Sequence, residues 1–263
     1  RGNYTETDVK EAARAFTGWS HRLDGEFVFR RRDHDAGTKT ILGKTGNFDG
    51  DEVLEILLEK RETARFIARK LYRFLVNEAQ VPEERVNWLG DRFYDSGYKI
   101  MRLLEDIARS DWFYAPENMG VKIKSPIEFW VGIRRAIPME LADPESQLVL
   151  QKALGQILFY PPNVAGWPGG RNWIDSSSLM LRLRIPQLLY RNQDLDVRGK
   201  TDDDQQMGEA AKGQLRRLMA VLDWQALNNL FAATPDHSVI EKLAEFLWAT
   251  PTKTLPLEVM KKN

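Results

Sequence analysis

Two carboxylates flank a histidine in the segment Asp33-His34-Asp35, and this triplet is the best candidate for chemistry in the sequence. A histidine oriented by a neighbouring carboxylate can act as a base or bind a divalent metal. A metal site needs three or more converging ligands, however, and the other histidines, His21 and His237, lie elsewhere in the chain. The same triplet also fits a turn in which the aspartates bind backbone N–H groups.

The stretch 155–174 is the second candidate, because it combines aromatic rings with directional polar groups. The residues that could form a recognition surface are Asn163, Trp167, Arg171, Asn172 and Trp173. Indole rings stack on sugars or peptide side chains, while asparagine and arginine supply hydrogen bonds. In the alternative interpretation, Trp167 and Trp173 are buried anchors of a glycine-rich loop, and Asn163 and Arg171 stay available to a ligand.

The composition restricts the function classes. The chain has 263 residues, a formal net charge of zero and no cysteine. A neutral chain lacks the basic excess that phosphate neutralisation needs, so we expect no nucleic-acid partner. No apolar run is long enough for a membrane span, and a cysteine-based zinc site is excluded. No cofactor is predicted, and no hydrolase signature such as G-x-S-x-G or H-E-x-x-H occurs.

The elements that must position these candidates are mostly helices. Apolar residues at helical spacing predict a mainly α, multi-helix globular bundle. Ser125-Pro126-Ile127-Glu128 is the clearest helix start, with a capping box and proline in the first turn. Glu26–Arg30 and Lys39–Leu42 predict the two strands of one small β-hairpin, at about residues 26–42. The prolines and glycines of stretch 155–174 exclude regular structure, so we expect a long ordered Pro/Gly/Trp-rich loop there.

The domain organisation follows from changes in composition along the chain. A main helical domain is expected over residues 1–192, including the hairpin and the central loop 155–174. Residues 193–207 are acidic and poor in apolar side chains, which is typical of a linker. Residues 208–263 predict a C-terminal helical cluster, with helices at 208–222, 224–232 and 238–250. Whether this cluster packs on the main domain is left open.

Five blocks of sequence in the same order resemble one bacterial family, which is known as domain of unknown function 1800. The blocks are Tyr4-Thr5-Glu6 with Ala15-Phe16-Thr17-Gly18-Trp19, His34-Asp35-Ala36-Gly37, Ala64-Arg65-Phe66-Ile67-Ala68, Lys124-Ser125-Pro126-Ile127-Glu128-Phe129, and Pro161-Pro162-Asn163-Val164-Ala165-Gly166-Trp167-Pro168-Gly169-Gly170. The resemblance covers the chain from Tyr4 to Tyr190. It implies a mostly helical fold without an established activity, and an extracytoplasmic location because members often look exported. Family members usually have a helical region before the first block, so the resemblance implies a C-terminal portion with that upstream region as a partner.

Two functional hypotheses follow. The first is a non-catalytic binding or scaffolding module that uses the aromatic loop to hold a protein or carbohydrate partner. The second is a metal-assisted hydrolase centred on Asp33, His34 and Asp35, with a divalent metal as cofactor and Arg171 contacting an oxyanion or phosphate. The sequence favours the first, because it carries an aromatic loop and no catalytic signature.

Overall fold

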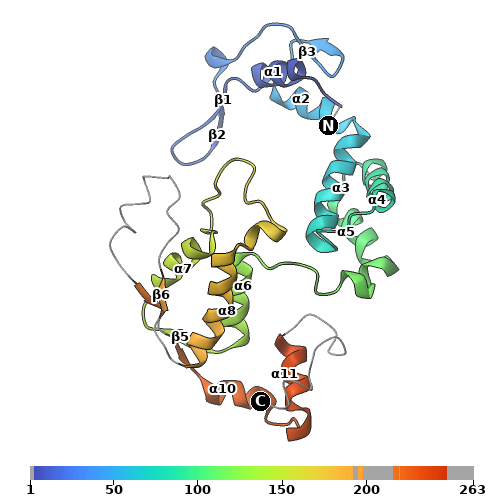
Figure 1. Cartoon of the computed structure of the whole chain (residues 1–263). Coiled ribbons are helices and arrows are strands. Elements are labelled where there is room, and N and C mark those ends of the chain that lie inside the picture. The colour runs from blue at the N-terminus through green and yellow to red at the C-terminus, as the bar shows by residue number, and fades with distance from the viewer. Residues whose placement is uncertain (1–2, 192–194, 198–215, 219, 248–263) are drawn as a thin grey trace. The chain divides into compact units, whose positions relative to one another are not determined.

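The computed structural model describes residues 3–191, 195–197, 216–218 and 220–247, and helices predominate among them (Figure 1). The prediction of a mainly α protein is therefore confirmed. The chain divides into two compact units, residues 1–114 (unit 1) and 115–263 (unit 2). The sequence analysis places no boundary at this point, which falls inside the main domain expected over residues 1–192. No helix in the described part of the chain is both long enough and apolar enough to cross a membrane.

Unit 1 contains five helices, two β-hairpins and two short 3-10 turns in its described residues. The helices are α1 (Glu6–Ala15), α2 (Gly50–Leu58), α3 (Arg61–Leu75), α4 (Glu83–Asp95) and α5 (Ile100–Ala108). The strands are β1 (Trp19–His21), β2 (Phe27–Phe29), β3 (Lys39–Ile41) and β4 (Lys44–Gly46). The 3-10 turns are η1 (Arg31–Asp33) and η2 (Asp111–Tyr114).

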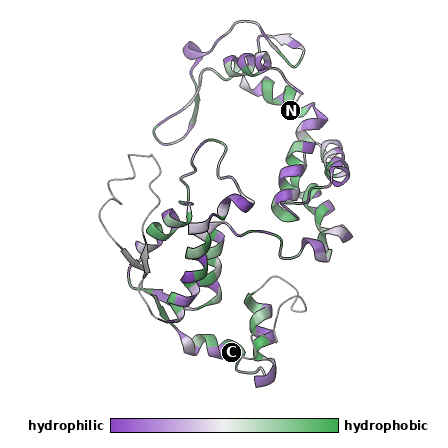
Figure 2. Cartoon of the chain, viewed as in Figure 1, coloured by the Kyte–Doolittle hydropathy of each residue, from purple (hydrophilic) through white to green (hydrophobic). Residues whose placement is uncertain are grey.

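The larger core of unit 1 lies between α3 and α4. Ala64, Ala68 and Tyr72 recur every four residues along α3 and are fully buried, because this spacing keeps them on one helical face. Hydrophobic and hydrophilic residues accordingly alternate in bands along α3 (Figure 2). Gly90 of α4 allows the close approach of the two helices, since a Cβ at this position would lie 2.5 Å from Cγ of Arg65.

The prediction of a single hairpin is wrong in its pairing. Both predicted strands exist, but β2 pairs with β1 and β3 pairs with β4, each antiparallel. Ile41 faces Lys44 across a two-residue turn in which Leu42 and Gly43 have φ values of 49° and 83°. Positive φ at both central residues is typical of the tight turns that close hairpins. Leu-Gly is a weaker sequence signal for such a turn than Asn-Gly is. The strand β4, which follows the turn and pairs with β3, was therefore not predicted.

Unit 2 begins with η3 (Pro116–Asn118) and is built around α6 (Pro126–Ala136), α7 (Ser146–Leu154) and α8 (Ser176–Tyr190). It also contains β5 (Met139–Leu141), η4 (Gly170–Trp173), β6 (Leu195–Val197), β7 (Arg216–Leu218), β8 (Ala220–Leu222), α10 (Trp224–Phe231), η5 (Asp236–Ser238) and α11 (Val239–Leu247). The predicted start of α6 is confirmed. Ser125 Oγ accepts from the Glu128 N–H at 3.2 Å, and Glu128 Oε2 accepts from the Ser125 N–H at 2.9 Å.

The core of unit 2 joins α6, α7 and α8 to the later part of the chain. Trp130, Leu150 and Ile185 are buried in it together with Ala220 and Leu222 of β8. Strand β8 pairs with β5, and β6 pairs with β7. This arrangement packs Ala220 and Leu222 into the core that the helices on both sides of residues 155–174 form.

The helix predicted over residues 208–222 is wrong where the structure describes it, because residues 216–218 and 220–222 are strands. Ala220 and Leu222 are buried while Val221 is exposed, which is the alternation that a strand with one packed face requires. Tertiary packing against β5 therefore overrides the local helical preference. The expected linker 193–207 lies outside the described residues except for β6.

Candidate functional site

Asp35 is held by an arginine from α1. Arg14 donates through Nε to Asp35 Oδ2 at 2.7 Å and through Nη2 to Asp35 Oδ1 at 3.1 Å. Oδ1 also accepts from the Gly37 N–H at 2.9 Å, and the Asp35 N–H donates to Thr17 Oγ1 at 2.8 Å. The fully buried Lys39 donates through Nζ to the Asp35 carbonyl at 2.5 Å. Asp35 thus ties the loop before β3 to α1, and its pKa is lowered to about 2, chiefly by the hydrogen bonds from Arg14.

His34 is oriented by the backbone of unit 1. Its Nδ1 lies 2.9 Å from the Thr17 carbonyl, and since a carbonyl only accepts, Nδ1 must carry the proton. The ring packs edge-on against Phe29, with the centroids 5.3 Å apart. The contact with Thr17 thus fixes the orientation of the ring and leaves Nε2 as the nitrogen that can make a further hydrogen bond.

The triplet does not form a converging metal site in the structure. Among the residues that the structure describes, no three histidine, aspartate, glutamate or cysteine side chains come together in a way that would hold a metal ion. Asp33 is the exposed last residue of η1, and both oxygens of Asp35 already accept hydrogen bonds from Arg14. The geometry thus gives Asp35 a structural role.

His34 borders a hollow of about 560 Å³ in unit 1. The residues that line it are Phe29, Arg31, Arg32, His34, Ala36, Asn47 and Asp49. Phe29 ends β2, four of the residues form or follow η1, and the last two precede α2 at its N-terminus. The hollow thus gathers one aromatic ring and several polar side chains from segments that are close in sequence. Sequence reasoning singled out His34 but missed its neighbours, although the run Arg30-Arg31-Arg32 was a visible signal.

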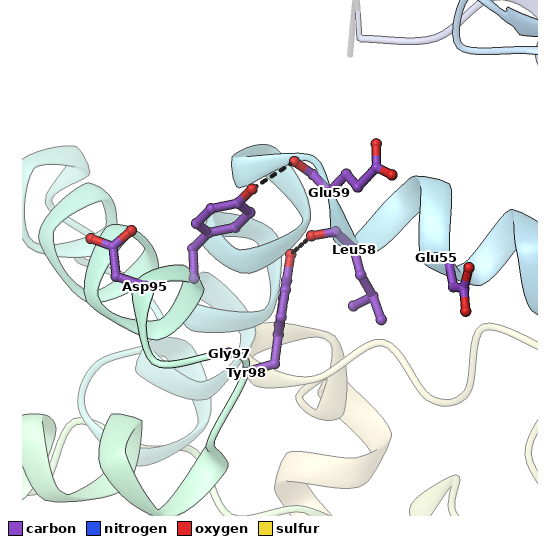
Figure 3. Close-up of a pocket in the computed structure, with 7 residues that line it drawn as sticks. Glu55, Leu58, Glu59, Asp95, Gly97 and Tyr98 are labelled. Carbon is purple, nitrogen blue, oxygen red and sulfur yellow. Dashed lines mark hydrogen bonds between the residues drawn. The ribbon is translucent and has the colours of Figure 1, made fainter.

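A second hollow of unit 1, of about 520 Å³, lies between the end of α2 and the end of α4 (Figure 3). The Tyr94 hydroxyl donates to the Glu59 carbonyl at 3.1 Å, and the Tyr98 hydroxyl donates to the Leu58 carbonyl at 2.7 Å. Asp95 forms an ion pair with Arg61 at 2.9 Å. These polar groups already join the end of α4 to the end of α2 and to α3, so this hollow is the weaker candidate site.

The second group of candidate residues lies in unit 2, on the aromatic loop, which we define as residues 155–174. Its start is marked by Gly155, which ends α7 with φ 90°, a backbone conformation that favours glycine. Trp173 is buried, with 8% of its surface exposed, and Trp167 is half-buried. Burial of Trp173 supports an anchoring role for this residue.

The loop uses part of its own polar groups to stay folded. Asn163 Oδ1 accepts from the Ala165 N–H at 2.9 Å, and Asn172 Nδ2 donates to the Gly169 carbonyl at 3.0 Å. At the base of the loop, the Leu158 N–H donates to Gln151 Oε1 at 3.0 Å. Arg171 is exposed and has no ion pair within the described residues.

The most exposed apolar side chains of the loop were missed by the sequence analysis. Val164 is fully exposed and Phe159 is 90% exposed, with Leu158 and Tyr160 partly exposed beside them. Phe159 has φ 63°, within a turn in which the Tyr160 N–H donates to the Ile157 carbonyl at 3.0 Å. A non-glycine residue with positive φ is uncommon, and such strain often marks a functional segment. No pattern in the sequence distinguishes an exposed Phe159 from a buried one.

The described elements define a mainly helical protein of two units. Residues 1–255 match the family described as "Protein of unknown function (DUF1800)", and the chain belongs to this family. The match extends past Tyr190, where the resemblance in the sequence ended. The chain matches no curated protein and no solved structure.

Proposed function

We propose that the protein is a non-catalytic binding module that holds a partner protein through the aromatic loop of unit 2. The observation that carries this proposal is Phe159, which is 90% exposed on an ordered turn with a positive φ. Large aromatic side chains presented to solvent are typical of residues that dominate binding energies at protein interfaces.

The loop is suited to binding because it is ordered before a partner arrives. The Gln151 side chain binds the Leu158 N–H, and Gln156 Oε1 accepts from the Ile127 N–H of α6 at 3.1 Å. Trp173 anchors the other end of the loop in the interior. A loop that is already ordered loses little conformational entropy on binding, so more of the contact energy appears as affinity.

The chemistry of the exposed loop favours a protein over a carbohydrate. The side chains around Phe159 are aliphatic or aromatic, whereas sugar rings also require many hydrogen bonds to their hydroxyl groups. Asn163 and Asn172, which could have supplied them, already bind the loop's own backbone. We therefore expect an apolar pocket on the partner, with an acidic residue near Arg171.

The proposal is tested by selecting binders from a random peptide library displayed on phage, with the whole purified chain as bait. We expect enriched peptides to be apolar with an acidic flank, and the variant Phe159→Ser to lose their binding. Phe66→Ser is the matched control, since Phe66 is also an exposed phenylalanine, at 57%, but belongs to α3 of unit 1.

Two results would count against the proposal. If enriched peptides bind Phe159→Ser as tightly as the unaltered chain, the aromatic loop is not the binding surface. If a glycan array gives binding that depends on Phe159 while the peptide library gives none, the partner is a carbohydrate instead.

A further inference from the structure

We propose that the hollow of unit 1 beside His34 is a binding site for the phosphate group of a small molecule. The proposal is independent of the aromatic loop, which belongs to unit 2. It rests on the two arginines that line the hollow, on the oriented ring of His34 and on the aromatic wall formed by Phe29.

The two arginines of the hollow form no ion pair with a carboxylate. Most other arginines of the unit form ion pairs, for example Arg65 with Asp91 at 2.9 Å and Arg92 with Asp106 at 2.8 Å. Arg31 and Arg32 are exposed on η1 and have no such pair within the described residues. Two unmatched guanidinium groups at one hollow form a local positive charge in a chain of zero net charge.

The remaining lining residues add directional and apolar contacts. His34 is held in place by the Thr17 carbonyl, so its ring has one preferred orientation beside the hollow. Asn47 adds an amide that can donate to an oxygen. Phe29 is 39% exposed and offers a ring against which an apolar part of a ligand can pack.

The carboxylates near the hollow reduce this charge but do not remove it. Asp49 lines the hollow and carries one negative charge against the two positive charges of Arg31 and Arg32, and its Oδ1 accepts from the N–H groups of Asp51 and Glu52 at 3.0 and 3.1 Å, at the N-terminus of α2. Asp35 is paired with Arg14 outside the lining set. Asp33 carries a negative charge on the same 3-10 turn but does not line the hollow.

Phosphate fits this arrangement better than a single carboxylate does. A phosphate monoester carries a charge of about −1.5 to −2 at neutral pH, which matches two arginines. Guanidinium groups also bind phosphate oxygens in a bidentate manner. The volume of about 560 Å³ leaves room for an organic group next to Phe29.

The test is calorimetric titration of the whole chain with inorganic phosphate, phenyl phosphate and benzoate. We expect phenyl phosphate to bind more tightly than inorganic phosphate, and benzoate to bind weakly. The variants Arg31→Gln and Arg32→Gln should each weaken phenyl phosphate binding by about tenfold or more, as expected for loss of a charge-assisted hydrogen bond. Arg30→Gln is the matched control, because Arg30 is the adjacent exposed arginine but does not line the hollow.

Three outcomes would overturn the proposal. Equal weakening by Arg30→Gln would show general charge attraction without a defined site. Benzoate binding as tight as phenyl phosphate would assign the hollow to carboxylates, and no binding of any phosphate at millimolar concentration would remove the site. Asn47→Asp gives a further check that leaves the arginines intact, since the added negative charge should also abolish phosphate binding while circular dichroism stays unchanged.

Discussion

Arg14 of α1 and Asp35 of the loop before β3 form a two-point ion pair, with nitrogen–oxygen distances of 2.7 and 3.1 Å. The same guanidinium donates to Glu11 at 2.7 Å, so the arginine lies between two carboxylates. This pairing engages both carboxylate oxygens of the aspartate in the His-Asp-Ala-Gly block. It also makes an electrostatic link that depends on pH.

The Arg14–Asp35 pair predicts acid sensitivity of unit 1. The pKa of Asp35 falls from 3.8 to about 2 in the folded chain, chiefly through the hydrogen bonds from Arg14. A carboxyl group with a depressed pKa stabilises the fold above its unfolded pKa, and this contribution disappears as the pH falls through the folded value. We therefore expect Asp35→Asn to lower the thermal unfolding midpoint at pH 7, and the difference from the unaltered chain to shrink between about pH 4 and pH 2.

Asp33→Asn is the control for this experiment, because Asp33 is exposed on η1, two residues before the paired aspartate. Because its side chain is exposed, Asp33→Asn should leave the unfolding midpoint at pH 7 unchanged. An equal loss of stability in both variants at pH 7 would mean that Arg14 contributes nothing specific. Because the pair is about one-third exposed, high salt should also reduce the effect of Asp35→Asn.

Gly18, at the end of α1, lies so close to the loop that carries His34 that a larger side chain should destabilise the fold. Its φ is 82°, and a Cβ there would lie 2.8 Å from the Arg30 carbonyl oxygen and 3.1 Å from Cβ of His34. Gly18→Ala should therefore lower the free energy of unfolding by more than the roughly 1 kcal/mol that positive φ alone costs a residue with a side chain. Gly25→Ala measures the cost of positive φ alone, since Gly25 has φ 87° but no atom within 4 Å of its added Cβ. Chemical denaturation of both variants gives the comparison, and equal losses would refute the steric part.

Two aromatic side chains of the loop should differ in how much they stabilise the fold. Trp173 is buried, so Trp173→Ala should destabilise the chain by about 3–5 kcal/mol through lost burial and an internal cavity. Phe159 is 90% exposed, so Phe159→Ala should change stability by less than about 0.5 kcal/mol. Denaturant titration followed by circular dichroism measures both. A large loss in Phe159→Ala would indicate that this ring stabilises the fold and is not reserved for a partner.

The sequence was sufficient to predict those features that depend on residues close together in the chain. The capping box at Ser125 and Glu128 was predicted and is present, because caps depend on residues three apart. The partners of β2 and β3 were not predicted, since two-residue turns such as Leu42-Gly43 and the β1 strand carry weak signals. Residues 220–222 needed a distant strand, β5, to become strand themselves.

From the sequence it was possible to predict which segments carry the candidate sites, but not what their side chains do. The His34 loop and the aromatic loop were identified from composition, because unusual residue types are visible in a sequence. What each side chain does was not, since the role of Asp35 depends on Arg14, 21 residues away, and the exposure of Phe159 depends on a backbone turn. The arginines of the hollow became candidates only from the folded structure, in which neither Arg31 nor Arg32 forms an ion pair within the described residues.

Arg182 of α8 supplies the last prediction, because its guanidinium is buried with few partners. It is 9% exposed, donates through Nη1 to the Lys124 carbonyl at 2.9 Å and lies 5.2 Å from the centre of the Phe129 ring, while Nε and Nη2 have no hydrogen-bond partner among the residues that the structure describes. Burial accordingly lowers its pKa. Removing a buried group with unsatisfied donors while keeping its volume is often neutral or stabilising, so Arg182→Met should leave the free energy of unfolding unchanged or raise it.

Arg182→Ala is the comparison, since it removes the same charge but leaves a cavity beside α6, and it should cost about 2 kcal/mol or more. The two variants therefore separate the packing of the side chain from its charge, and equilibrium denaturation measures both. A loss in Arg182→Met as large as that in Arg182→Ala would mean that the charge itself stabilises unit 2. In that case a water molecule or an anion must satisfy Nε and Nη2 in solution, because two bare donors of a buried cation could not stabilise the fold.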